Sequence, residues 1–183
     1  MQVLIGFFVV LAALVLGVRF VVGRRLKEVK KYLSGNDDVE VQRKPVLAFK
    51  PKNGSVRAGF VFYPGGLVDA EAYGRIAAYL ARHGILTVLG SPWMRVAWFD
   101  RKLANRAMEA FPQVPAWFLG GHSLGGVVAA FYLRDEVEKV ENGTIRGMVL
   151  MGAFVPEKYK LANLALPVLS MFGTKDGLAG RFE

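Results

Sequence analysis

The fold of this chain is decided by one short stretch, Gly120-Gly121-His122-Ser123-Leu124-Gly125-Gly126. Trp117-Phe118-Leu119 before it predicts a short buried strand, and the apolar residues after it predict a helix. Ser123 therefore lies on a strand-to-helix turn, which is the setting that the nucleophile-elbow pattern G-x-S-x-G requires. Such a turn strains the serine backbone, and side chains two residues to either side would collide, so Gly121 and Gly125 suit it. An ordinary glycine-rich turn is the alternative, and the flanking strand and helix favour the elbow.

A second glycine motif, Phe62-Tyr63-Pro64-Gly65-Gly66, follows the predicted strand 58–63. With these two motifs the chain resembles the α/β-hydrolase family from about Val56 to its last residues, and it looks most like small bacterial-type hydrolases with Tyr-Pro-Gly-Gly after the third strand. The resemblance implies a mostly parallel sheet with helices on both faces. It also implies a Ser-acid-His triad that hydrolyses an ester, thioester or amide through an acyl-enzyme, without a cofactor.

The resemblance assigns roles to particular residues. Ser123 is the expected nucleophile, and the N–H groups of Gly66 and Leu124 are the expected oxyanion hole. Asp176 follows the second predicted strand after the elbow, where this family carries the triad acid. Each loop residue also has a plain interpretation: Pro64-Gly65 as a turn without chemistry, and Asp176 as a turn aspartate before glycine.

The general base is missing from this pattern. His122 is the neighbour of the serine and should point away from it, and His83 is expected to close a helix at the opposite end of the sheet. The family's histidine comes one strand later, whereas the chain stops at Glu183, seven residues after Asp176. We therefore expect a hydrolase sequence that lacks its last strand, catalytic histidine and final helix. The alternative is a non-catalytic α/β-hydrolase-like module that binds a small acyl ligand or a partner.

The composition limits the other classes of function. With 183 residues the chain can form one domain with a good core, and the absence of cysteine excludes disulfides and thiol catalysis. Two histidines without a carboxylate cluster argue against a metal site. The net charge of +9 would suit a nucleic-acid binder, but no nucleic-acid-binding motif is present. The expected partners are a small acyl-containing substrate and a lipid bilayer, and no motif indicates an oligomeric state.

The N-terminus predicts a membrane anchor. An apolar run from Val3 to Gly23, interrupted only by Arg19, is long enough to cross a bilayer as a helix. A cleaved signal peptide is the alternative, but no Lys or Arg precedes the run and no clear cleavage site follows it. The basic cluster that begins at Arg24 places the globular part in the cytoplasm by the positive-inside tendency. The predicted organisation is a transmembrane anchor over 1–23, a basic juxtamembrane linker over 24–38 and a truncated α/β-hydrolase domain over 39–183.

Hydrophobic runs predict the remaining elements. The expected strands cover residues 39–41, 46–49, 58–63, 85–89, 117–119, 145–151 and 168–172, and the expected helices cover 69–82, 101–110 and the elbow helix, with a short helix or cap over 156–164. Asn53-Gly54 predicts a hairpin-like turn into the strand 58–63, and Asp69 is the expected cap of its helix. Four large residues, Trp93, Met94, Trp98 and Phe99, either line a pocket or pack a helix on the sheet.

Overall fold

A seven-stranded sheet forms the centre of the protein. The structure, a computed structural model, describes residues 29, 31–155, 161 and 164–174. Its strands lie in the order β1-β2-β4-β3-β5-β6-β7. Their bounds are β1 (Val39–Gln42), β2 (Leu47–Pro51), β3 (Ala58–Tyr63), β4 (Ile85–Leu89), β5 (Trp117–His122), β6 (Ile145–Met151) and β7 (Val168–Met171).

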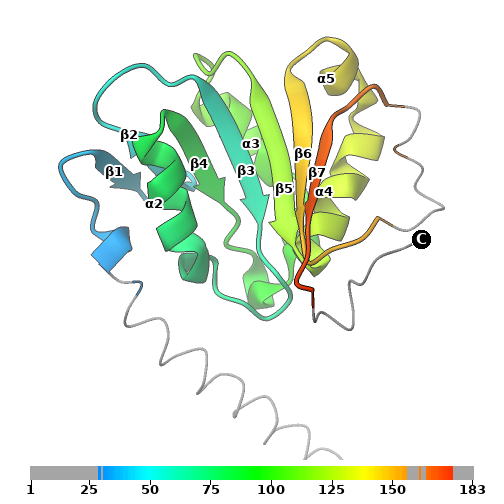
Figure 1. The fold of residues 1–183 in the computed structure, drawn as a ribbon, viewed down its shortest axis with the longest axis horizontal. Coiled ribbons are helices and arrows are strands. Elements are labelled where there is room, and N and C mark those ends of the chain that lie inside the picture. The colour runs from blue at the N-terminus through cyan, green and yellow to red at the C-terminus, as the bar shows by residue number, and fades with distance from the viewer. Residues whose placement is uncertain (1–28, 30, 156–160, 162–163, 175–183) are drawn as a thin grey trace, which may run out of the picture.

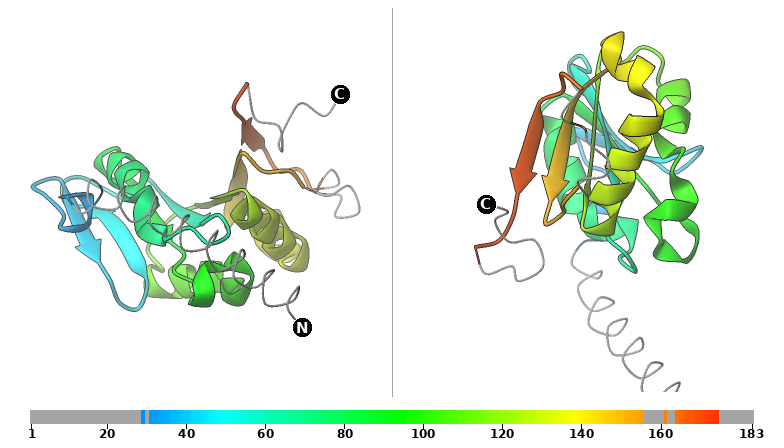
Figure 2. Two further views of the ribbon diagram at one scale, coloured as in Figure 1. Left: turned by 90° about the horizontal axis from the view of Figure 1, so that it is seen from below. Right: turned by 90° about the vertical axis from the view of Figure 1, so that its right-hand side faces the viewer.

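Helices connect the strands on both faces of the sheet (Figures 1 and 2). The described helices are η1 (Ala70–Tyr73), α2 (Gly74–Arg82), η2 (Trp93–Arg95), η3 (Ala97–Asp100), α3 (Leu103–Ala110), α4 (Leu124–Asp135) and α5 (Val137–Glu141). Helix α2 covers one face, and α3, α4 and α5 cover the other. Strands β3 to β7 pair in parallel, while β1 pairs with β2 and β2 with β4 in antiparallel fashion. The prediction of a mostly parallel sheet with helices on both faces is confirmed.

Alternation along β3 explains why the sheet has two cores. Val61 and Tyr63 pack with α3 and α4, whereas Phe60 and Phe62 pack with α2. All four side chains are buried. A strand buried on both faces reads as a continuous apolar run, which is why its bounds could be predicted from the sequence. Burial of a side chain of this size contributes about 1.5–3 kcal/mol, so β3 is a main stabilising element.

The structure corrects the predicted strand pairing. Asn53-Gly54 does make a turn, with Gly54 at a φ of 82°, but β2 and β3 do not form a hairpin. Strand β4 lies between them, and β2 pairs with β1 and β4. The turn dipeptide is a local signal, whereas the partner of a strand is decided by the apolar faces that it can bury.

Two side-chain predictions also change. Asp69 precedes η1 but makes no capping hydrogen bond, because its carboxylate pairs with Arg95. Trp93, Met94 and Phe99 are exposed and neither pack a helix on the sheet nor line the cavity of about 470 Å³ beside β2 and β4. Trp98 is also exposed, although its ring contacts Phe131 of α4.

The membrane anchor predicted for the N-terminus concerns residues that the structure does not describe. The predicted membrane span lies outside the described residues, as does most of the segment 156–164. No helix of the described part is long and apolar enough to cross a membrane. Strand β7 forms one edge of the described sheet, and its residues are exposed.

Candidate active site

Ser123 lies where β5 ends and α4 begins. Its backbone has a φ of 50° and a ψ of −122°, a conformation that few non-glycine residues adopt. The residue is exposed, and its N–H donates to the carbonyl of Met151 at the end of β6 over 3.0 Å. The serine is thus held at the carboxyl end of the sheet, with its strained backbone fixed by β6 and by the helix that follows.

The glycines around Ser123 are required by close backbone contacts. A Cβ on Gly121 would lie 2.4 Å from the carbonyl carbon of Gly125. A Cβ on Gly125 would lie 2.1 Å from the carbonyl oxygen of Tyr63 and 2.5 Å from that of Pro64. A side chain at either position would therefore collide with the backbone, as the sequence predicted. The turn also packs directly against the end of β3.

This packing brings the two expected oxyanion donors to one place. Gly66 adjoins the first residue of α4, because a Cβ on Gly66 would be 3.5 Å from Cδ2 of Leu124. In the described part of the chain, neither Gly66 nor Leu124 donates its backbone N–H to another group. Two free donors beside an exposed serine form the arrangement that can stabilise a developing oxyanion.

A hydrogen-bond relay that the sequence did not indicate joins the two loops. The hydroxyl of Tyr73 accepts the Gly65 N–H over 3.1 Å and lies 3.0 Å from Nδ1 of His122. The oxygen accepts from Gly65 and keeps its own proton, so it can also donate to Nδ1 in the tautomer of His122 that leaves this nitrogen unprotonated. Burial raises the pKa of the Tyr73 hydroxyl above its ordinary value of 10.0, so it stays a donor at neutral pH.

Neither histidine is placed to activate Ser123 directly. His122 faces Tyr73 on the α2 side of the sheet, as its contacts with that residue and Gly65 show. His83 ends α2, its Nδ1 lies 2.8 Å from the Tyr79 carbonyl, and its neighbour Gly84 has a φ of 79°. It lies at the amino end of the sheet, far from the elbow.

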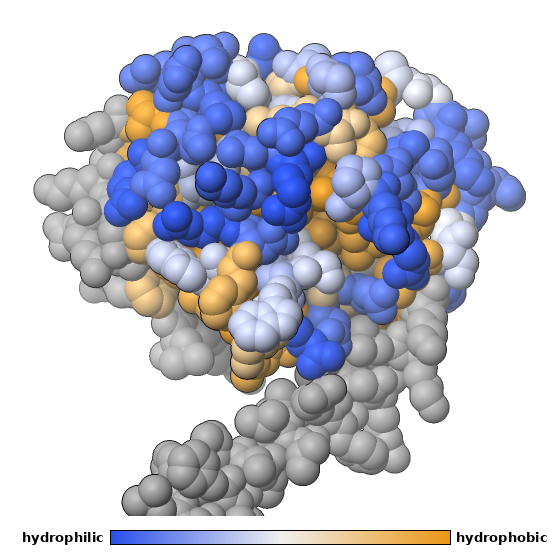
Figure 3. Space-filling model, turned by 180° about the vertical axis from the view of Figure 1, so that it is seen from behind, coloured by the Kyte–Doolittle hydropathy of each residue, from blue (hydrophilic) through white to orange (hydrophobic). Residues whose placement is uncertain are grey.

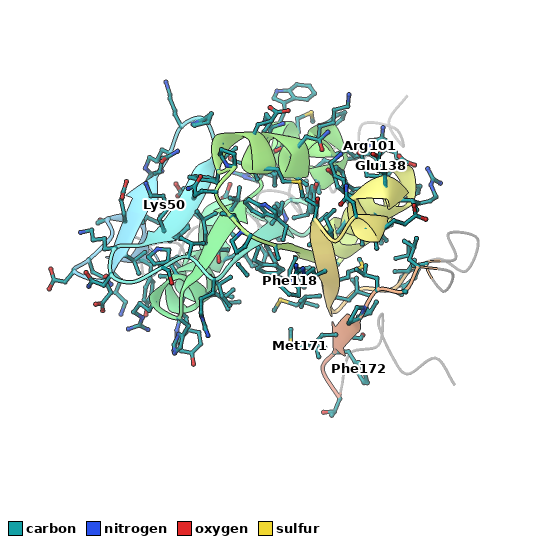
Figure 4. All side chains as sticks on the ribbon, turned by 90° about the horizontal axis from the view of Figure 1, so that it is seen from above. Lys50, Arg101, Phe118, Glu138, Met171 and Phe172 are labelled. Atoms are coloured by element: carbon teal, nitrogen blue, oxygen red, sulfur yellow. The ribbon has the colours of Figure 1, made fainter. Side chains whose placement is uncertain are left out.

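The expected acid, Asp176, lies outside the described residues. The strand before it is in register with the elbow, because His122 pairs with Met151 and Met151 pairs with Met171. Two strand spacings separate the ends of β5 and β7, or about 10 Å. Figure 4 shows Met171 and Phe172 at the outer edge of the sheet, on the side away from Arg101 and Glu138. The chain after β7 therefore starts at the same end of the sheet as Ser123.

A separate cavity of about 470 Å³ lies beside β2 and β4. It is lined by charged pairs, including Arg43 with Glu71 at 3.1 Å and Arg106 with Asp100 at 2.6 Å. Burial raises the pKa of Asp100, against the opposing effect of Arg106. Strand β3 stands between this cavity and the elbow strand, so it does not form the site around Ser123. No cluster of potential metal ligands occurs among the described residues.

Comparison with known proteins gives one structural neighbour and one family match. The crystal structure of TT1662 from Thermus thermophilus is similar over 63% of this chain, with 20% sequence identity and a TM-score of 0.47. The chain spans 57% of the length of that protein. No curated protein matches the sequence. The sequence profile of the Alpha/beta hydrolase family matches residues 59–182, which is more than half of the chain. The chain belongs to the alpha/beta hydrolase family.

Proposed function

We propose that this protein is a membrane-anchored serine hydrolase that cleaves an ester, thioester or amide through an acyl-enzyme. The observation that carries the proposal is the geometry at Ser123: an exposed serine in a strained turn, with the N-terminus of α4 behind it. A turn of this kind stores backbone strain that packing alone would not select. Family membership supports a hydrolase-like function.

In the proposed reaction the base takes the proton of the Ser123 hydroxyl while the serine oxygen attacks the carbonyl carbon of the acyl group. The tetrahedral oxyanion accepts hydrogen bonds from the N–H groups of Leu124 and Gly66, and the leaving group departs with a proton from the base. Water then gives a proton to the base and attacks the acyl-enzyme, and the acid is released as the Ser123 oxygen recovers its proton from the base. Asp176 orients the base in this scheme, and we propose that the base is a histidine in a continuation of the chain beyond Glu183.

Membrane attachment is the second part of the proposal. It rests on the apolar run from Val3 to Gly23 and on the basic cluster that follows it. In this arrangement the protein crosses the membrane once and the hydrolase domain lies in the cytoplasm. The protein should then stay in the membrane fraction after extraction with alkaline carbonate.

Labelling by a fluorophosphonate probe tests the nucleophile. The chain extended by its downstream coding sequence should be labelled, and Ser123→Ala should abolish the labelling, whereas the 183-residue chain should react only at background level. Ser55→Ala is the matched control, because Ser55 is also exposed but precedes β3 at the other end of the sheet. Equal labelling of Ser123→Ala would place the nucleophile elsewhere. An unlabelled extended chain would instead favour the non-catalytic binding module.

A further inference from the structure

The loop after β4 exposes a cluster of large apolar side chains. Trp93 is 72% exposed, Met94 61% and Phe99 58%, and the rings of Trp93 and Phe99 contact each other edge to face at 5.5 Å. Trp98 and, from the neighbouring loop, Leu67 are also exposed. Contiguous apolar surface of this kind is uncommon on soluble monomers and marks an interaction surface. We call residues 92–102 together with Leu67 the aromatic rim.

The rim is held in this shape by its own hydrogen bonds. Met94 and Arg95 have positive φ angles of 53° and 56°, which non-glycine residues rarely adopt. The carbonyl of Arg95 accepts the N–H of Leu67 over 2.9 Å, and its guanidinium pairs with Asp69. Two strained residues fixed by these bonds keep the aromatic side chains turned outward, so their exposure is built into the loop.

The rim lies at the same end of the sheet as Ser123. It follows the carboxyl end of β4, and β3, β4 and β5 are parallel, so their carboxyl ends share one edge. In Figure 1 the arrowheads of these strands point to the lower edge of the molecule. Figure 3 shows apolar and pale side chains gathered at that lower end, beneath a largely hydrophilic upper surface.

Cations accompany the aromatic residues. The guanidinium of Arg101 lies 5.0 Å above the ring of Trp98 and 3.9 Å from the carboxylate of Asp135 in α4, while the next residue, Lys102, is exposed. Aromatic rings next to Lys and Arg side chains are the combination that favours the headgroup layer of an anionic bilayer. The chain as a whole carries a net charge of +9, which adds to this attraction.

The start of the described chain gives a second, geometric argument. Side chains of Val29 and Leu33 lie against Gly74, the first residue of α2, at 3.3 and 3.1 Å from the position of its Cβ. Helix α2 begins at the carboxyl end of the sheet, so the chain enters the domain at the end that carries the rim. Only residues 24–28 separate Val29 from the predicted membrane span, and this tether reaches at most about 20 Å.

That tether is too short for the opposite orientation. The headgroup layer is about 5–7 Å thick on each side of a bilayer. A strand as long as β5 adds about 20 Å between the two ends of the sheet. If the amino end of the sheet faced the membrane, the tether would have to cross both distances, which is more than its full length. The tether therefore argues against an orientation with the amino end toward the bilayer and is compatible with docking through the carboxyl end.

We propose that the aromatic rim docks on an anionic lipid bilayer and directs the mouth of the Ser123 site toward it. This inference rests on the membrane anchor and the hydrolase activity proposed above, and it adds the source of the substrate. The enzyme takes acyl chains from lipids of the membrane in which it is anchored. Trp93, Met94 and Phe99 enter the headgroup layer, and Lys102 meets the anionic headgroups.

The three tryptophans of the chain make the test direct. Trp93 and Trp98 lie in the rim, whereas Trp117 is 2% exposed at the amino end of β5. The full chain is reconstituted into vesicles of phosphatidylcholine and phosphatidylserine in which brominated phosphatidylcholine quenches tryptophan fluorescence. The variant Trp98→Phe should lose most of its Trp93 emission in these vesicles. The double variant Trp93→Phe/Trp98→Phe, which retains Trp117 as a control for folding, should be unaffected.

Each outcome decides a separate point. Unquenched Trp93 emission would overturn the docking, and equal quenching in vesicles without phosphatidylserine would overturn the requirement for anionic lipid. Quenching needs no turnover, so Ser123→Ala should retain it. If the extended chain is labelled at Ser123 but the Trp93 emission is not quenched, the docking is refuted and the proposed function stands. If the Trp93 emission is quenched but Ser123 of the extended chain is not labelled, the catalytic proposal is refuted and the docking stands.

Discussion

The substitution Gly125→Ala tests whether the elbow depends on contact between two backbones. Gly125 lies in the first turn of α4 and is buried against the end of β3. The added methyl group would lie 2.1 Å from the carbonyl oxygen of Tyr63, whereas real Cβ atoms almost never come closer than 3.0 Å to another heavy atom. Helix α4 or strand β3 must therefore shift by about 1 Å, since a carbonyl in a strand cannot rotate away.

The magnitude follows from two opposing effects. In an open helix, replacing glycine by alanine stabilises by about 1 kcal/mol. Overpacking a fixed site costs about 1–3 kcal/mol, and the cost lies at the upper end here because both atoms in conflict belong to the backbone. We expect a net loss of about 2 kcal/mol in the free energy of unfolding. A displacement of 1 Å at a catalytic group can also reduce the rate by about 10²-fold.

Denaturant titration of the detergent-solubilised protein, followed by circular dichroism, measures the first effect. Fluorophosphonate labelling of the extended chain measures the second. Gly143→Ala is the matched control: its φ of 77° makes alanine costly by about 1–2 kcal/mol, but no atom lies within 4 Å of the added Cβ. The control should lose stability without any change in labelling rate. Our reasoning is refuted if Gly125→Ala is as stable as the parent protein or is labelled at the same rate.

Two tyrosines give further predictions. Tyr73→Phe removes the hydroxyl shared by Gly65 and His122, and we expect a loss of about 1 kcal/mol in stability and slower labelling, measured by the same two assays. Burial raises the pKa of Tyr63, whose hydroxyl donates to the Arg101 carbonyl over 2.8 Å. Because the pKa of Tyr63 is higher in the folded than in the unfolded protein, its neutral form stabilises the fold fully when the pH is below the ordinary tyrosine pKa of about 10. This contribution is lost progressively as the pH rises above that value. The denaturant concentration at the unfolding midpoint should therefore decrease as the pH is raised beyond 10, and it should decrease less steeply in Tyr63→Phe. The same pH dependence in both proteins would contradict a raised pKa of Tyr63.

Local sterics and apolar patterning allowed several features to be predicted from the sequence alone. The strands 58–63, 85–89 and 145–151 were predicted with their observed bounds, because uninterrupted apolar runs between turn residues leave few alternatives. The turn at Ser123 was likewise predictable. In a strand-to-helix turn of this shape, side chains two residues to either side of the serine would collide with the backbone, and the sequence has glycine at both positions. His83-Gly84 marked a helix end for the same local reason.

Contacts between distant segments were decided only by the tertiary structure. Asp69 looked like a helix cap, but Arg95, 26 residues later in the sequence, takes its carboxylate. Strand β2 pairs with β1 and β4 rather than with β3, the next strand in the chain, because the apolar faces of the sheet are completed in that order. Whether Trp93 packs inward or outward depends on the fold of two loops together. A residue pattern reports periodicity and turn preference along the chain, while the partner of a polar group and the side on which an aromatic ring lies depend on which segments meet in space.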